Sequence, residues 1–308
     1  MSSLHTYRFS VGIEQQDMRL DAYLAEETTN LSRSYLQKLI KEGQVQINGI
    51  TIVKPSTAVC EGDEIVCELP ESSEPEIVAE DLPLEVLYED EDLLVVNKPK
   101  GMVVHPSAGH PNGTLVNAVM YHCKANLSGI NGVMRPGIVH RIDMDTSGSL
   151  IICKNDMAHN SIAAQLKDHS IKRLYHAIVF GHLKDAEGTI DAPIGRDPKN
   201  RLRNAIVSNG KHAVTHYRVL EELNGFSYIE CRLETGRTHQ IRVHMASIHH
   251  PLLGDELYAG GFQSHLHTDG QVLHAKTIGF VHPRSGAYVE IDTELPAYFN
   301  KLLQVLRK

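Results

Sequence analysis

The sequence predicts an α+β protein with a large C-terminal domain, built on a mixed and mostly antiparallel sheet, and a small N-terminal domain of helices and a hairpin. Three observations support this fold class. A length of 308 residues exceeds one typical domain. Residues 71–83 are rich in acidic residues, Ser and Pro, as linkers are. Beyond them, short β-rich runs outnumber helical patterns, which favours α+β over a regular βαβ alternation.

The predicted boundaries are an N-terminal strand or tail (1–16), a small domain (17–75), an acidic linker (76–85) and a large domain (86–308). In the small domain, apolar residues at helical spacing predict helices over 19–25 and 34–42. A hairpin of 45–47 and 50–53 follows, because Asn48-Gly49 supplies the positive φ angles of a type I′ turn. Three basic residues then fall near one exposed face: Arg33, Lys38 and Lys41.

The large domain reads as a series of strands with few helices. Apolar and β-branched runs bounded by turn residues predict strands over 86–88, 93–97, 149–154, 175–181, 214–221 and 227–233. Helical period and length predict helices over 114–121 and 158–168.

The composition excludes some classes of protein. The apolar runs are strand-sized, far short of the ~20 residues that cross a bilayer, so no membrane partner is expected. The N-terminus is polar and lacks an apolar signal core, so we expect a cytoplasmic protein. Five cysteines without a CxxC pair favour reduced thiols over a disulfide framework.

The net charge of −8 does not exclude a nucleic-acid partner, because the acidic residues are concentrated in one place. Residues 61–94 hold 14 Asp and Glu and no Lys or Arg, so the remainder has 24 acidic against 30 basic residues, a net charge of +6. Solubility explains the acidic stretch equally well. The local basic clusters are present whether or not the acidic stretch serves only solubility.

One polar segment, GIVHRIDMDTSG (137–148), directly precedes an apolar strand. A carboxylate packed against a core needs a cation or hydrogen-bond donors. If the segment is extended, Arg141 and Asp143 face the same side and can pair. Taken alone, the segment fits a structural ion pair as well as a catalytic site.

A second polar segment, ETGRTHQIRVH (234–244), follows another strand pattern. Its arginines suit carboxylate or phosphate binding. The five-residue spacing of His239 and His244 matches no usual zinc pattern, so we expect no metal.

These segments and their order resemble the pseudouridine synthases of the RluA/RluD branch. The similar motifs are NKPKGMVVHP, HRIDMDTSG, KRLYHAIV, GKHAVTHYRVLE, LETGRTHQIRVH, HPLLGDELY and QVLHAKTIGFVHP, over nearly all of residues 80–308. About 55 N-terminal residues, with RLD, SRS, GQV and GD at matching positions, resemble the small RNA-binding domain shared with a small-subunit ribosomal protein. Together the two resemblances imply an enzyme that modifies a stem-loop of large-subunit ribosomal RNA.

The resemblance implies specific roles in the isomerisation of uridine to pseudouridine. Asp143 matches the family aspartate that acts on the ribose as a nucleophile or a base; the sequence does not choose between the two. Arg242 matches its arginine partner, with Arg237 as the alternative. Arg141 is expected to displace the uridine or hold the backbone, and Tyr175 to stack on the base and shuttle a proton.

Further residues of these motifs are expected to contact RNA: His140, Arg173, Arg237, Thr238, His239 and Gln240, together with Arg33, Lys38 and Lys41. The reaction needs no cofactor, and we expect a monomer whose partner is RNA, with ribosomal RNA favoured. The sequence departs from the family at His169, where arginine is usual, which puts the choice of RNA loop in doubt rather than the reaction.

Three alternatives stay open at this point. The same chemistry can act on transfer RNA, although the N-terminal domain favours ribosomal RNA. A ribosome-associated RNA-binding protein without catalysis would be expected to lack Asp143 or Tyr175, and both are present. A hydrolase would use Asp143 with His140, which leaves the arginines without a role.

Overall fold

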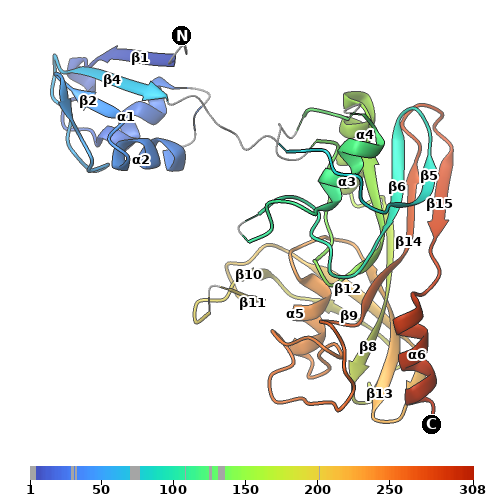
Figure 1. The fold of residues 1–308 in the computed structure, drawn as a ribbon. Coiled ribbons are helices and arrows are strands. Elements are labelled where there is room, and N and C mark those ends of the chain that lie inside the picture. The colour runs from blue at the N-terminus through green and yellow to red at the C-terminus, as the bar shows by residue number, and fades with distance from the viewer. Residues whose placement is uncertain are drawn as a thin grey trace. The chain divides into compact units, whose positions relative to one another are not determined.

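The fold is described from a computed structural model (Figure 1). The structure describes residues 5–28, 31, 33–69, 77–107, 109–124, 127–130, 136–200 and 202–308. The chain divides into two compact units, residues 1–74 and 75–308.

The N-terminal unit packs two helices against a four-stranded antiparallel sheet of order β1-β4-β2-β3. Its elements are β1 His5–Ser10, the 3-10 turn η1 Ile13–Gln15, α1 Leu20–Glu27, α2 Arg33–Lys41, β2 Val45–Ile47, β3 Ile50–Thr51 and β4 Glu64–Leu69. The predicted Asn48-Gly49 turn is present, with φ of 50° and 76°. Leu24, Leu36 and Ile40 are among the fully buried side chains of this unit's core.

The first strand is part of this sheet and not a separate tail. β1 pairs with β4 over six residue pairs, from His5 with Leu69 to Ser10 with Glu64. The small unit therefore begins before residue 17, because the sheet needs β1 to cover one edge of β4.

The C-terminal unit is built on a nine-stranded mixed sheet of order β5-β6-β7-β14-β8-β13-β12-β9, with β15 also paired to β14. Among the described strand pairs of this sheet, β7 with β14 is parallel and the others are antiparallel. The strands are β5 Glu85–Glu89, β6 Leu93–Lys98, β7 Ser147–Cys153, β8 Lys172–Phe180, β9 Glu187–Asp191, β12 Val214–Leu223, β13 Phe226–Leu233, β14 Leu273–Val281 and β15 Tyr288–Asp292. A separate hairpin pairs β10 Ile194–Arg196 with β11 Asn204–Ile206. The predicted α+β class with a large, mostly antiparallel sheet is confirmed.

Helices cover both faces of this sheet, so its central strand β7 is buried on both sides, whereas the outer strands β5, β9 and β15 are largely exposed. The helices are α3 Leu115–His122, α4 Asp156–Lys167, α5 Gln240–Ser247 and α6 Ala297–Leu306. Alternate residues of β7 show the two faces: Leu150 and Ile152 pack in one core with residues of α3 and α5, whereas Ile151 and Cys153 pack in another with residues of α4. The face toward α3 and α5 carries the polar segments singled out in the sequence.

The predicted linker over 76–85 is wrong in its described part. Ile77 is buried in the core beneath α3, the side chain of Asn117 donates to the carbonyl of Val78 at 2.7 Å, and the amide of Glu80 donates to the carbonyl of Asn117 at 3.0 Å. These contacts fix the segment on the C-terminal unit, because Ile77 is buried in the core and Asn117 bonds the backbone on both sides of Ala79, although the charged residues suggested a solvated chain. Residues 70–76, which include part of the predicted linker, lie outside the described residues.

Candidate active site

The loop that carries Asp143 is held to the sheet by buried polar contacts. The ammonium of Lys98, which is fully buried, donates to the carbonyl of Met144 at 2.9 Å, and the amide of Gly101 donates to the same carbonyl at 3.0 Å. The amide of Thr146 donates to the carbonyl of Asp143 at 3.1 Å, which closes the turn. These contacts hold the loop through its backbone carbonyls, so the carboxylate of Asp143 does not take part in holding the loop.

Asp143 faces a cleft of about 530 Å³ and makes two contacts with the second polar segment. Arg242 Nη1 donates to Asp143 Oδ2 at 2.9 Å, and His239 Nε2 lies 3.8 Å from Asp143 Oδ1. The side chain of Asp143 is 18% exposed, so it is accessible from the cleft. The two polar segments therefore form one site, with a carboxylate and a cation side by side.

The local pairing of Asp143 with Arg141 is not observed. Arg141 is exposed and lines the cleft, and no ion pair joins it to Asp143. Residues 140–146 form an irregular loop rather than a strand, so the alternation assumed from the sequence does not apply to them.

A second carboxylate, Asp255, fixes the orientation of Arg242. Arg242 donates to Asp255 through Nε at 2.7 Å and through Nη2 at 3.0 Å, and the side chain of Asp255 is fully buried. Burial alone would lower the pKa of Arg242, but Asp255 and Asp143 together raise it above its ordinary value. The bidentate geometry leaves Nη1 aimed at Asp143. Asp255 lies within the HPLLGDELY motif, but the sequence offered no signal for this role.

His239 stands at the start of α5 in a left-handed backbone conformation, with φ 60° and ψ 22°. Such a conformation is uncommon for a residue other than glycine and is often found at functional sites. Its Nδ1 lies 2.9 Å from the hydroxyl of Tyr258, and the Tyr258 ring lies 5.0 Å from Arg242 Cζ. Burial lowers the pKa of His239, although the charge of Asp143 opposes this. An uncharged imidazole therefore borders the carboxylate.

Tyr175 and Arg173 lie two residues apart on β8 and line the same cleft. Tyr175 is 9% exposed, and burial raises the pKa of its hydroxyl. No hydrogen bond joins the Tyr175 hydroxyl to any of the described residues, which leaves it available to a ligand. The ring supplies an apolar wall close to the Asp143 carboxylate.

Gln240, one of the predicted RNA contacts, forms hydrogen bonds within the protein instead. Gln240 is 3% exposed; its Oε1 accepts from Thr235 and Arg237, and its Nε2 donates to Val214 and Thr215. Every polar atom of this side chain is thus occupied, so Gln240 is a structural residue of the turn.

His140 was also predicted to contact RNA. Its Nε2 accepts the amide proton of Ile151 at 2.9 Å, and burial lowers the pKa of this histidine to about 3. The ring is therefore uncharged and holds the loop to β7. It does not have the acid–base role with Asp143 that a hydrolase would require.

The other predicted contacts, Arg237 and Thr238, lie on the turn before α5 and line the cleft. Arg237 Nε donates to the carbonyl of His212 at 2.9 Å and makes no ion pair with Asp143, so it is not the alternative partner of that carboxylate. Thr238 is exposed, and its carbonyl accepts from the Asn204 side chain at 2.9 Å.

Comparison with known proteins identifies the family. The model for "RNA pseudouridylate synthase" matches residues 92–247, which contain the paired segments of the cleft. The chain belongs to the RNA pseudouridine synthases. The S4 domain model matches residues 18–65. This synthase thus has an S4 domain on the N-terminal side of its synthase domain.

Individual relatives match the sequence of this synthase over nearly its full length. It is 51% identical to the uncharacterized RNA pseudouridine synthase YlyB of Bacillus subtilis, with 96% of each protein covered. It is 50% identical to the ribosomal large subunit pseudouridine synthase D of Zymomonas mobilis, with 94% of this chain and 93% of the relative covered. The solved structure of human RNA pseudouridylate synthase domain containing 1 matches with a TM-score of 0.59 at 26% identity, covering 74% of this chain and 96% of that one.

The S4 domain presents the three predicted basic residues on α2, where Arg33, Lys38 and Lys41 are exposed. Asp21, buried beneath α2, pairs with Arg33 at 3.2 Å and with Arg19 at 3.0 Å. Burial alone would raise the pKa of Asp21, but hydrogen bonds from Arg19, Gln37 and Arg33 lower it to about 2. Asp21 thus holds the guanidinium of Arg33 at the start of α2.

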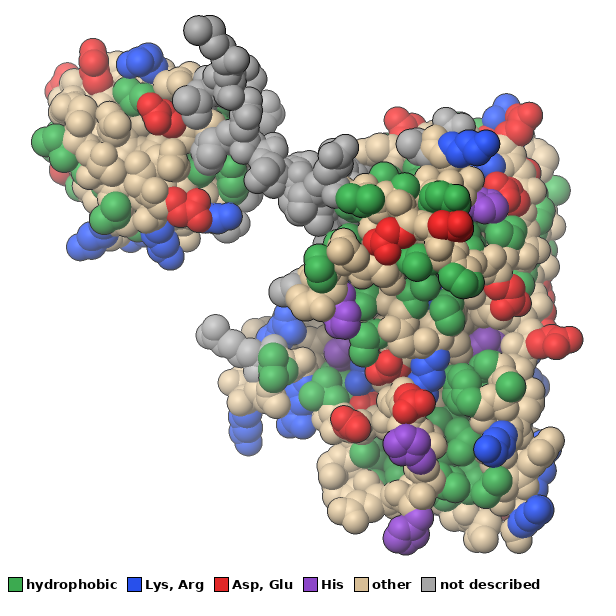
Figure 2. Space-filling view, in the orientation of Figure 1, with side chains coloured by type: hydrophobic (Ala, Val, Ile, Leu, Met, Phe, Trp, Pro, Cys, Tyr) green, Lys and Arg blue, Asp and Glu red, His purple; other side chains and the backbone are tan. Residues whose placement is uncertain are grey.

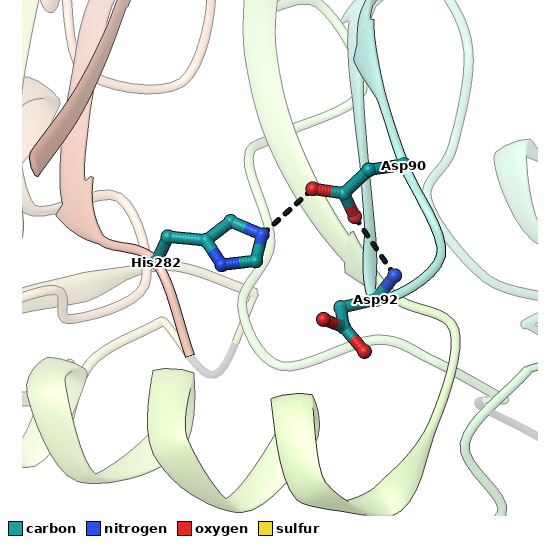
Figure 3. A group of neighbouring side chains, drawn as sticks. All are labelled: Asp90, Asp92 and His282. Atoms are coloured by element: carbon teal, nitrogen blue, oxygen red, sulfur yellow. Dashed lines mark hydrogen bonds and ion pairs between the residues drawn. The ribbon is translucent and has the colours of Figure 1, made fainter. Parts of the chain in front are cut away.

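A cluster of potential metal ligands in the synthase, formed by Asp90, Asp92 and His282 (Figure 3), lies outside the cleft. His282 Nε2 lies 2.7 Å from Asp90 Oδ2, while Asp90 Oδ1 accepts the amide protons of Asp92 and Leu93 at 2.8 Å. Arg284 donates to both oxygens of Asp92, at 2.7 and 2.6 Å. Protein donors occupy these oxygens, so the cluster joins the β5–β6 turn to the turn after β14 and does not offer a metal site.

The ion pair of Asp92 with Arg284 predicts that the protein loses stability in acid. Hydrogen bonds from Arg284 lower the pKa of Asp92 to about 2, below its usual 3.8. A carboxyl with a lowered folded-state pKa stabilises the fold above pH 4, and this contribution is lost as the pH falls through about 2. We expect Asp92→Asn to lower the melting temperature at pH 7 and to match the wild type near pH 2. A difference that is independent of pH between 7 and 2 would contradict the ion pair.

No helix in the described part of the chain is long and apolar enough to span a membrane.

Proposed function

We propose that this synthase isomerises a uridine in a stem-loop of large-subunit ribosomal RNA, and that Asp143 acts on the ribose of the extruded nucleotide. The observation that carries the proposal is the contact of Asp143 with Arg242 at 2.9 Å, at the wall of an open cleft. The reaction breaks the N1–C1′ bond, forms a C5–C1′ bond and moves a proton from C5 to N1, so atoms balance without a cofactor. A uridine in a helix must leave the stack before its sugar can reach such a carboxylate.

The other residues of the cleft fit the same reaction. In this proposal, Tyr175 stacks on the base, Arg242 holds the carboxylate, and the exposed Arg141 fills the place of the extruded uridine or holds the backbone. Arg237, Thr238 and His239 contact the RNA at the rim. The enzyme acts as a monomer in the cytoplasm.

Two features support ribosomal RNA as the substrate. The Zymomonas mobilis and Pseudomonas aeruginosa relatives, at 50% and 41% identity, both carry the name ribosomal large subunit pseudouridine synthase D. The S4 domain adds the exposed basic residues of α2, which suit contacts with the phosphates of a structured RNA. Figure 2 also shows Lys and Arg side chains gathered at the β10–β11 hairpin, near His side chains.

Site-resolved mapping of pseudouridine tests the substrate. Total RNA from cells with and without the gene is treated with a carbodiimide reagent or analysed by mass spectrometry. We expect one or more sites in large-subunit ribosomal RNA to disappear and to return with the wild-type gene. Loss confined to transfer RNA would refute the ribosomal assignment, and no change in any RNA would refute the proposal.

The binding of RNA through phosphates predicts a steep dependence on salt. The logarithm of the association constant should fall linearly with the logarithm of salt concentration, with a slope of roughly −0.7 to −0.9 for each phosphate neutralised. We expect Lys41→Met, which removes an exposed α2 ammonium, to reduce this slope by about one phosphate and to leave the rate at saturating RNA unchanged.

The matched control is Lys184→Met, which removes an exposed ammonium from the β8–β9 turn. It should not change the slope. A flat salt dependence of the wild type, or equal effects of the two variants, would contradict an RNA-binding face on α2.

A further inference from the structure

Arg173 is a buried arginine on the cleft face of the central sheet. Along β8, residues 173 and 175 are buried, whereas 172, 174 and 176 are only partly buried, so Arg173 and Tyr175 point to the same face. Arg173 is 7% exposed and lines the cleft together with Tyr175 and Asp143. A guanidinium so deep in a protein needs a physical reason.

No acidic side chain in the described part of the chain pairs with Arg173. Its Nη2 donates to the backbone carbonyl of Glu234 at 2.8 Å, and its Nε is buried without a hydrogen-bond partner. Burial lowers the pKa of Arg173, and the nearby Tyr175 offsets this only in part. Arg242, which lines the same cleft, is paired with two carboxylates. The two arginines thus differ: one positive charge is neutralised by the protein, and the other is not.

The protein makes room for this uncompensated charge. A Cβ atom at Gly236 would lie 2.7 Å from Arg173 Nη1, so a side chain at residue 236 would displace the guanidinium from its present position. Because an unpaired buried charge destabilises a fold, such an arrangement is expected where a negative charge appears during function.

The reaction creates a negative charge in this cleft. When the N1–C1′ bond breaks, the bonding electrons leave with the base, and the detached uracil is an anion delocalised over N1, O2 and O4. We propose that Arg173 supplies the positive charge that stabilises this uracil anion until its C5 attacks C1′. The inference rests on the proposed function and extends it from the ribose side of the reaction to the base side.

The position of Arg173 favours the base over a phosphate group as its ligand. Arg141 is exposed and Arg237 half-buried on the same cleft, so both can reach the RNA backbone. Arg173 lies deeper and beside Tyr175, whose ring suits a planar base. In a cleft closed by RNA, little water screens the charge, and a fixed cation stabilises a transient anion more strongly than it does in solution.

The first test separates binding from chemistry. Single-turnover rates and RNA dissociation constants are measured for Arg173→Met, Arg173→Lys and the control Lys172→Met, whose ammonium pairs with Glu290 at 2.9 Å on the other face of β8. We expect Arg173→Met to slow the reaction by about 100-fold, with RNA affinity unchanged, and Arg173→Lys to retain part of the rate. Lys172→Met should behave as the wild type.

The alternative roles give different results. If Arg173 binds a phosphate, Arg173→Met weakens RNA binding and lowers the salt slope by about one phosphate, which would overturn the inference. A variant with wild-type rate and affinity would overturn it as well. If Arg173 serves only to hold the fold, Arg173→Met lowers the melting temperature, and the rate per folded molecule does not change. An inactive wild-type enzyme would instead refute the proposed function itself.

A change in the leaving group gives an independent test that requires no further mutation. In RNA with 5-fluorouridine at the target position, fluorine withdraws electrons and the detached base carries its negative charge more readily. Cleavage of this nucleoside should therefore depend less on Arg173, so the defect of Arg173→Met should be smaller than with uridine. An equal defect on both substrates would show that Arg173 does not act on the charge of the base.

Discussion

Asp143→Asn should abolish pseudouridine formation while leaving the fold and RNA binding intact. Asparagine matches aspartate in size, but it is neither a nucleophile nor a base toward the ribose, so we expect the single-turnover rate to fall by at least about 10⁴-fold. Arg242 keeps its two hydrogen bonds to Asp255 in this variant, so no buried charge is left unpaired. The melting temperature should therefore be equal to or above that of the wild type. RNA affinity should be unchanged or higher, because a negative charge has left the cleft.

Asp145→Asn is the matched control. Asp145 lies two residues away in the same loop, but it lines a different cavity, beside Lys100 and Tyr298. This variant should retain the wild-type rate. A catalytically competent Asp143→Asn enzyme, in purified form or in rescued cells, would refute the proposed role of the carboxylate.

The fold was predictable where apolar periodicity is regular. The strand patterns at 93–97, 149–154 and 227–233 correspond to β6, β7 and β13, and the small domain's hairpin followed from Asn48-Gly49. The sequence did not indicate β14 or α5, because each buries polar side chains. β14 contains the buried His274, and α5 contains the buried Arg242 and His244. The ring nitrogens of His244 form hydrogen bonds with the Thr215 hydroxyl and the Ala192 carbonyl inside the protein. Polar residues in a core obscure the periodicity that predicts an element.

The site was predictable in part, for a related reason. The pairing of Asp143 with Arg242 joins residues 99 apart in the chain, and only the resemblance to a family suggested it. Local spacing pointed to Arg141 instead, since a sequence shows neighbours along the chain and not across the sheet. The role of Asp255 was not predicted, because nothing in the sequence distinguishes a buried carboxylate with a distant partner from an ordinary acidic residue in a turn. The left-handed backbone at His239 likewise has no signature in the sequence.

Asp255→Asn is expected to impair both stability and catalysis. Asparagine keeps the shape of the side chain, but it removes the charge that compensates the buried Arg242 and replaces an acceptor with a donor. Breaking one partner of a buried pair costs about 3 kcal/mol. Arg242 would then shift, and Asp143 with it. Misplacement of a reacting group by about 1 Å costs roughly 100-fold in rate, so we expect a loss of this size in single-turnover rate, with little change in RNA affinity.

Asp92→Asn separates the two effects, because Asp92 also makes a bidentate pair with an arginine, Arg284, but lies outside the cleft. Both variants should have lower melting temperatures than the wild type. At a temperature where both remain folded, only Asp255→Asn should be slow, because Arg242 donates to the carboxylate of Asp143 and Arg284 does not. Equal rates for the two variants would mean that Asp255 contributes to the fold alone, and that Arg242 keeps its position at Asp143 without it.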